Sequence, residues 1–130
     1  MSELAIFDDE RKKWIQYDED SEVLIKHINK EELQKISQKA DKAAKLTGSD
    51  RANIFSRLLG RASILGWRKI DNHAHPGLML KGQPLQFTPE NIDMLMQKSL
   101  EYSIFVNENA IDSKLFLEEE KEKEELKNVS

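Results

Sequence analysis

The change from strand-like to helix-like sequence falls within one stretch, WIQYDEDSEVLIKHINKEELQKI (residues 14–36). Its first half holds two runs of branched and aromatic residues, 14–17 and 22–28, separated by the polar segment 18–21. Such a pattern favours a β-hairpin. Asn29 follows, with Glu32 three positions later, which is the spacing of a helix N-cap and its partner. The stretch therefore predicts an N-terminal hairpin that leads directly into a helix.

Two helices are expected after the hairpin. The first, over residues 30–46, has a narrow, alanine-rich apolar stripe and ends at the segment 47–49, whose Gly48 supplies a stop. The second, over residues 50–66, has a broad apolar arc that should face the core, because ~100° per residue brings its apolar positions together. The stripe comprises Leu33, Ile36, Ala40, Ala43 and Ala44, and the arc comprises Ile54, Phe55, Leu58, Leu59, Ala62 and Leu65.

Residues 69–88 are rich in Gly and Pro and are predicted to form a long ordered loop with one short strand at 85–87. A further helix should begin at Thr88, because Thr is a good N-cap and Pro89 costs nothing at the first helical position. Its buried stripe is predicted to be Ile92, Leu95, Met96, Leu100 and Tyr102, whereas Met94 and Phe105 need another surface to cover them.

The C-terminal part is expected to form a last helix from Asn107 onward, contacting other elements through Ala110, Ile111, Leu115 and Phe116. Beyond it, residues 118–127 contain a single large apolar side chain, Leu126, so no packed core can hold this segment. We predict a charged lead-in over residues 1–13, one globular domain over 14–117 and an acidic solvated tail over 118–130. The fold class expected is α+β, mostly α, with about four helices and the short N-terminal hairpin.

The composition limits the classes of protein to which the chain can belong. With 130 residues it has the size of a single domain, and its longest apolar runs are far shorter than the ~20 residues of a membrane span. It has no cysteine, which excludes disulfides, thiolate metal sites and cysteine nucleophiles. The start of the chain lacks the basic and apolar segments of a secretory signal. We therefore expect a protein of the cytoplasm.

Charge is strongly segregated along the chain. The net charge is −5 over residues 1–22, +6 over residues 42–69 and −5 over residues 101–130. Either the acidic ends fold against the basic middle, or the middle faces a negatively charged partner.

The segment Asp71-Asn72-His73-Ala74-His75-Pro76-Gly77 resembles the metal-binding stretch of metal-dependent amidohydrolases, in which two histidines hold a divalent ion. Such a site needs further ligands from later strands of a large barrel, and the only other histidine here is His27. An ordinary polar loop is therefore the favoured interpretation, with a metal-binding protein that uses Asp71, His73 and His75 as an alternative.

The basic middle offers a possible phosphate-binding face through Arg51, Arg57, Arg61, Arg68 and Lys69. The competing interpretation is that these side chains lie on the flank and at the ends of a helix and form ion pairs with the acidic ends of the chain. A small regulatory or nucleic-acid-binding module stays as an alternative function, although the acidic pI near 5.5 disfavours it. No phosphate-cradling glycine loop, nucleophile elbow or paired-carboxylate motif is present, and we single out no catalytic, cofactor-binding or metal-binding residues.

The order of segments is more specific than any one of them. A Trp-led hairpin, an Ala-rich helix and the segment Gly66-Trp67-Arg68-Lys69-Ile70 precede Gly82-Gln83-Pro84-Leu85-Gln86-Phe87-Thr88-Pro89-Glu90-Asn91, a helix ending at Phe105-Val106 and an acidic tail ending at Leu126-Lys127-Asn128. Over residues 14–128 this order resembles the small tail assembly chaperones of long-tailed phages and prophages, which are encoded before the tape-measure protein. The chain departs from that pattern at residues 72–81, which stand where such proteins have a short acidic turn.

This resemblance implies a non-enzymatic protein of the bacterial host cytoplasm. Its partners would be the tail tape-measure protein, which it would coat and keep soluble, and the tail-tube protein, with homo-oligomer formation along the client. The side chains we assign to partner binding are Met94, Met96, Phe105 and Phe116, because such surplus apolar groups can receive a client helix, together with Arg57 and Arg61. The competing interpretation is that the apolar members only complete the core or a homodimer.

Overall fold

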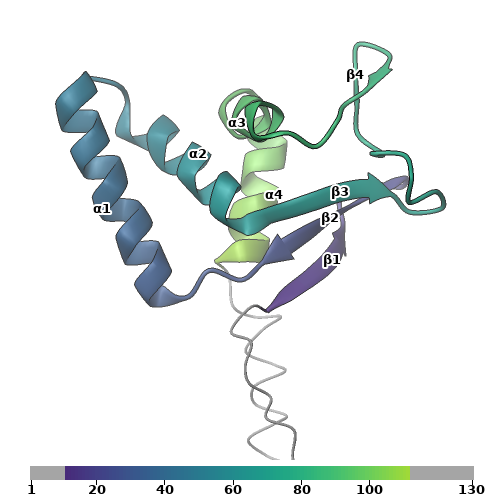
Figure 1. Cartoon of the computed structure of the whole chain (residues 1–130), viewed down its shortest axis with the longest axis horizontal. Coiled ribbons are helices and arrows are strands. Elements are labelled where there is room, and N and C mark those ends of the chain that lie inside the picture. The colour runs from purple at the N-terminus through teal and green to yellow at the C-terminus, as the bar shows by residue number, and fades with distance from the viewer. Residues whose placement is uncertain (1–10, 112–130) are drawn as a thin grey trace, which may run out of the picture.

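The computed structural model describes residues 11–111, which form a three-stranded antiparallel sheet, a small two-stranded hairpin and four helices (Figure 1). The predicted fold class, α+β and mostly α, is confirmed. The predictions for Leu115, Phe116 and the tail at 118–130 lie outside the described residues, as does most of the lead-in at 1–13. In chain order the elements are β1 (Lys12–Gln16), β2 (Ser21–Lys26), α1 (Lys30–Thr47), α2 (Arg51–Ser63), β3 (Ile64–Lys69), β4 (Met79–Leu80), β5 (Gln83–Pro84), α3 (Pro89–Lys98) and α4 (Leu100–Ala110).

The predicted hairpin is present as β1 and β2, and it begins two residues earlier than the predicted start of the domain at residue 14. Trp14 lies opposite Leu24, and Ile15 lies opposite Val23. The strands alternate in burial because successive side chains point to opposite faces of a sheet. Val23 and Ile25 on β2 are therefore fully buried, whereas their neighbours are only partly buried.

The third strand, β3, was not expected from the sequence. The helix predicted over 50–66 ends at Ser63, and the backbone turns extended at Ile64. Residues 64–69 then pair antiparallel with β2, so that Val23 lies opposite Trp67. The prediction of a helix over residues 64–66 failed because burial of Ile64 and Trp67 against β2 stabilises the fold more than another helical turn would. The pairing of this segment with β2 is not local, so the local sequence pattern does not show it. Leu65, expected in the buried arc, is half-exposed instead.

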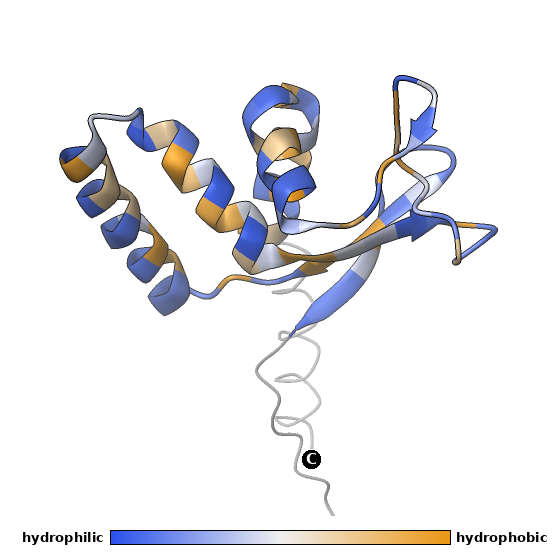
Figure 2. Ribbon diagram, turned by 45° about the horizontal axis from the view of Figure 1, so that its top comes forward, coloured by the Kyte–Doolittle hydropathy of each residue, from blue (hydrophilic) through white to orange (hydrophobic). Residues whose placement is uncertain are grey.

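The first helix agrees closely with its prediction. The side chain of Asn29 accepts a hydrogen bond from the N–H of Glu32 at 2.8 Å, and the N–H of Gly48 donates to the carbonyl of Ala44 at the other end. Only Ile36 and Ala40 are buried, because α1 packs mainly on α2. Figure 1 places α1 at one end of the molecule and the β4–β5 hairpin at the other, and hydrophilic residues dominate α1 (Figure 2).

The helix predicted from Thr88 begins as expected, since the Thr88 hydroxyl accepts a hydrogen bond from the N–H of Asn91 at 3.1 Å. It does not continue to Phe105. Ser99 ends α3 by donating its N–H to Leu95 and begins α4 by accepting a hydrogen bond from the N–H of Tyr102.

This break corrects two predictions. Leu100, expected in the buried stripe, is 76% exposed because the chain changes direction one residue before it. No new helix starts at Asn107, because residues 107–110 complete α4 and bury Ala110 beside β2. There the carbonyl of Ala110 accepts a hydrogen bond from the N–H of Ile28 at 3.0 Å.

The long loop contains a two-stranded hairpin, β4 and β5, instead of a strand at 85–87. Lys81 and Gly82 form its turn with positive φ angles of 51° and 80°. Leu78 and Leu85 anchor the hairpin to the core, because both side chains are buried and the N–H of Leu85 donates to the carbonyl of Leu78 at 2.8 Å.

Candidate binding pocket

Three of the four apolar side chains assigned to partner binding lie in or against the core. Met96 is buried at the contact between α3 and α2, where Gly60 makes room for it: a Cβ on Gly60 would lie 2.5 Å from the Met96 side chain. Met94 and Phe105 are partly buried against the same core. This arrangement supports the competing interpretation, in which these residues complete the core. Phe116 lies outside the described residues.

Most of the arginines of the basic middle are paired with carboxylates. Arg61 on α2 makes two hydrogen bonds to Asp93 on α3, at 2.8 and 2.6 Å, and Arg51 pairs with Asp41 on α1. Arg57 is partly buried, and its Nε has no hydrogen-bond partner among residues 11–111. The Arg51 and Arg61 pairs join neighbouring helices, so these two charges serve the fold.

Arg68 pairs with the acidic N-terminal region, as the sequence allowed. Its Nε donates to Glu22 at 2.8 Å, and its guanidinium stacks 3.7 Å from the ring centre of Trp14. The pair is partly buried on the two neighbouring strands β2 and β3.

The His73–His75 loop uses its polar groups to stabilise its own turn. His75 Nδ1 accepts a hydrogen bond from the N–H of Gly77 at 2.9 Å, and the carbonyl of His75 accepts one from the N–H of Lys69 at 2.7 Å. His73 lies 3.8 Å from Glu22, and Asp71 lies 3.7 Å from Lys69. Within the described part of the chain, no three His, Asp or Glu side chains gather closely enough to hold a metal ion.

A pocket of about 420 Å³ lies where three segments that are distant in the sequence meet. These are the β1–β2 turn (residues 17–20), the loop with the β4–β5 hairpin (77–85) and the α3–α4 junction (95–102). We call it the junction pocket. Its volume is in the range of sites that hold small ligands or side chains of a partner protein.

Apolar side chains form much of the wall of the junction pocket. Leu78 and Leu85 are buried and Leu95 is partly buried, whereas Met79 and Leu80 on β4 are 54% and 42% exposed. The β4–β5 hairpin therefore presents two flexible apolar side chains to solvent beside an apolar interior.

The β1–β2 turn brings two carboxylates to the same pocket. Asp18 Oδ1 accepts hydrogen bonds from the N–H of Asp20 at 2.9 Å and from the N–H and hydroxyl of Ser21 at 2.7 Å each. Partial burial by itself would raise the pKa of Asp18, but these hydrogen bonds outweigh it and hold the pKa below its usual value. Neither Asp18 nor Asp20 has an ion pair within residues 11–111, so the turn presents uncompensated negative charge.

Two tyrosines and a serine complete the pocket. Tyr102 is 1% exposed, and its hydroxyl has no hydrogen-bond partner among the residues described. The ring of Tyr17 packs edge-on against it, with centroids 5.2 Å apart, and Ser99 lines the same pocket.

Both tyrosine hydroxyls stay protonated at neutral pH. Burial raises the pKa of Tyr102, and the nearby Tyr17 adds to the increase. The pKa of Tyr17 is raised by burial and by the charges of Glu101 and Asp18. Each hydroxyl therefore keeps both a donor and an acceptor function.

No direct signal for this pocket is present in the sequence. The sequence pattern placed Tyr102 correctly in the buried stripe and segment 18–21 correctly in a turn, but nothing in their spacing showed that the two meet.

Among residues 11–111, every helix is too short or too polar to cross a membrane. Comparison with protein-family models, with curated proteins and with solved structures found no match to this chain.

Proposed function

We propose that this protein is a non-enzymatic tail assembly chaperone of a phage or prophage, which acts in the bacterial cytoplasm. It binds the tail tape-measure protein, keeps it soluble and helps to recruit tail-tube subunits around it. The segment order of residues 14–128 supports this proposal, and most of those segments belong to the described fold.

The observation that carries the proposal is the pair of exposed apolar side chains on β4 beside the junction pocket. Met79 and Leu80 are accessible, whereas the buried Met96 and the partly buried Met94 are engaged in the core. A methionine has several rotatable bonds and adapts to varied partner surfaces, which suits a protein that coats a long helical client. We therefore assign to Met79 and Leu80 the client contact that the sequence suggested for Met94 and Met96.

The test is co-expression with the tape-measure protein encoded nearest to this gene, with the soluble fraction of that client as the readout. The wild-type chain should raise the soluble fraction and co-elute with the client. The double substitution Met79→Asp plus Leu80→Asp should abolish both effects, because charged groups cannot enter an apolar contact without a large desolvation cost.

The matched control is Leu46→Asp, since Leu46 is 86% exposed at the far end of α1. It adds a charge at an apolar surface position and should leave the rescue intact. A wild-type chain that neither solubilises nor co-elutes with the client would refute the chaperone function. Rescue that survives the double substitution would refute only the assignment of the hairpin.

A further inference from the structure

Among residues 11–111, the free edge of the three-stranded sheet is formed by β1. The strand at the other edge, β3, continues directly from α2, and the loop after it folds back onto it, because the N–H of Lys69 donates to the carbonyl of His75 at 2.7 Å. No other described element runs along the outer side of β1 (Figure 1). An open strand edge is a template for pairing with another chain. The residues of β1 therefore determine which strand fits beside it.

The hydrogen-bond pattern identifies the backbone groups at this edge. The carbonyl of Arg11 accepts a hydrogen bond from the N–H of His27, and the N–H of Tyr17 donates to the carbonyl of Ser21. Backbone groups alternate in direction along an antiparallel strand, so the odd-numbered residues of β1 face β2 and the even-numbered residues 12, 14 and 16 face away from it. These three residues therefore present donors and acceptors that β2 does not use.

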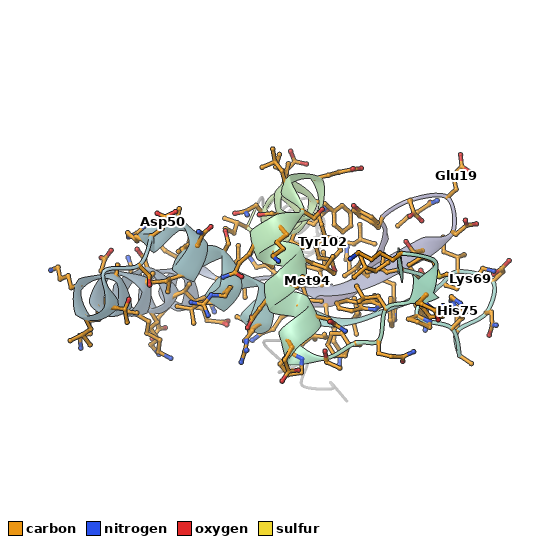
Figure 3. All side chains as sticks on the ribbon, turned by 90° about the horizontal axis from the view of Figure 1, so that it is seen from above. Glu19, Asp50, Lys69, His75, Met94 and Tyr102 are labelled. Atoms are coloured by element: carbon orange, nitrogen blue, oxygen red, sulfur yellow. The ribbon has the colours of Figure 1, made fainter. Side chains whose placement is uncertain are left out.

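Charges of opposite sign stand at the two ends of the edge. Lys12 is exposed at the start of β1, and Asp18 and Glu19 are exposed just beyond its end. Neither Lys12 nor Asp18 has an ion pair among residues 11–111. Figure 3 shows that the turn marked by Glu19 lies at the opposite end of the molecule from the α1–α2 turn, marked by Asp50. Edge lysines normally oppose pairing, but an antiparallel copy of this strand brings its own acidic turn to them.

We propose that two copies of this chain form a symmetric dimer by antiparallel pairing of β1 with β1, with Ile15 at the two-fold axis. Trp14 then lies opposite Gln16 of the second copy, and each such pair exchanges both of its backbone hydrogen bonds. In the same register Lys12 lies opposite Asp18 of the second copy, and symmetry produces this ion pair twice. With the axis at Trp14 instead, Lys12 would face Gln16 and the charges would not match.

The pairing also covers apolar surface. Trp14 is 37% exposed on the outer face of the sheet. In the proposed register the two copies of Trp14 are diagonal neighbours with Cα atoms roughly 7–8 Å apart, which is within reach of aromatic side chains. Since β3 offers no comparable edge, association stops at two copies. The dimer does not rest on the proposed chaperone function.

The first experiment measures the mass of the full chain by sedimentation equilibrium at pH 7, over a range of micromolar concentrations. The wild-type chain should approach twice the monomer mass. Gln16→Pro should stay monomeric, because it removes an edge N–H that the dimer uses and the monomer does not. Gln16→Ala is the matched control, since it removes the same side chain and keeps the N–H, and it should still dimerise. Circular dichroism checks that both variants fold.

A second pair of variants tests the charges. Lys12→Glu should weaken dimerisation at least about tenfold, because the substituted side chain faces Asp18 of the other copy at two symmetric positions. Lys39→Glu makes the same charge change at an exposed position of α1, at the other end of the molecule. It should change the dissociation constant less than about twofold, because charges separated by more than a Debye length are screened.

Cysteine cross-linking tests the register, and the absence of natural cysteines makes it unambiguous. At the two-fold axis the Cα atoms of Ile15 and its copy lie roughly 4.5 Å apart, which a disulfide can bridge. The two copies of Lys12 are separated by six residues along the strand, or about 20 Å. Under mild oxidation Ile15→Cys should therefore form a covalent dimer, whereas the more exposed Lys12→Cys should not.

Three results would overturn the proposal. They are a wild-type chain that is monomeric at every concentration, a dimer that persists in Gln16→Pro and Lys12→Glu, or faster cross-linking of Lys12→Cys than of Ile15→Cys. These measurements contain no client protein, so their failure and a failure of the co-expression test are independent results.

Discussion

The indole N–H of Trp67 on β3 donates a hydrogen bond to the carbonyl of Leu85, at 2.8 Å, in a buried environment. This contact links the sheet to the segment after the β4–β5 hairpin, and Leu85 in turn lines the junction pocket. The position of the hairpin therefore depends on a strand residue, Trp67, that lies 18 residues before Leu85 in the chain.

Trp67→Phe should destabilise the protein by about 2–4 kcal/mol. The substitution leaves the Leu85 carbonyl buried without its donor and also removes buried volume. Trp14→Phe is the matched control, because Trp14 is half-exposed on the edge strand β1 and should cost less than about 1 kcal/mol. Urea denaturation followed by circular dichroism measures both. Equal losses for the two variants would contradict the role assigned to Trp67.

Gly77→Ala should be much more destabilising than Gly82→Ala. Both glycines have a positive φ, of 79° and 80°, so an alanine is strained to a similar extent at each, by about 1 kcal/mol. A Cβ on Gly77 would also lie 2.7 Å from the backbone of Arg68, whereas no atom lies within 4 Å of one on Gly82. We expect at least about 2 kcal/mol of additional loss for Gly77→Ala, measured as the difference between the two free energies of unfolding. Similar values would show that the loop moves to relieve the clash.

Ser99→Ala should destabilise the protein by about 1 kcal/mol, because the Ser99 hydroxyl caps the N-terminus of α4. Ser103→Ala, one turn into the same helix, is the comparison and should change the free energy of unfolding by less than about 0.5 kcal/mol. The two variants are compared by thermal and urea denaturation at pH 7. A neutral Ser99→Ala variant would mean that the break between α3 and α4 does not need its cap.

Asp18→Asn should lower stability at neutral pH by about 1 kcal/mol, and the difference should vanish in acid. The folded-state pKa of Asp18 is lowered from its usual 3.8, so its stabilising effect is complete above that value. The effect is lost as pH falls through the lower, folded-state pKa. Free energies of unfolding of both proteins, measured between pH 7 and pH 2, should therefore begin to converge below about pH 4 and become equal only below the folded-state pKa of Asp18. A difference that stays constant over this range would exclude ionisation of Asp18 as its cause.

The elements that the sequence predicts well are those determined by neighbours in the chain. Asn29 and Thr88 cap the helices that follow them through hydrogen bonds to residues three positions away. The polar turn between β1 and β2 is also local, because Asp18 bonds to Ser21. These contacts need no tertiary structure, so the residue types at their spacing are enough to predict them.

The sequence by itself thus determined the fold class, the hairpin, α1 and the start of α3. Tertiary structure alone decided that residues 64–69 form a strand, because their pairing partner β2 lies some 40 residues away. It also decided which apolar side chains stay accessible: Met96 fills the space left by Gly60, whereas Met79 remains exposed. The junction pocket also depends on tertiary structure, because Asp18, Leu85 and Tyr102 come together only when the sheet, the hairpin and α4 pack around one core. Hydrogen-bond caps act over one helical turn, but burial of apolar surface acts between any segments that the fold brings into contact.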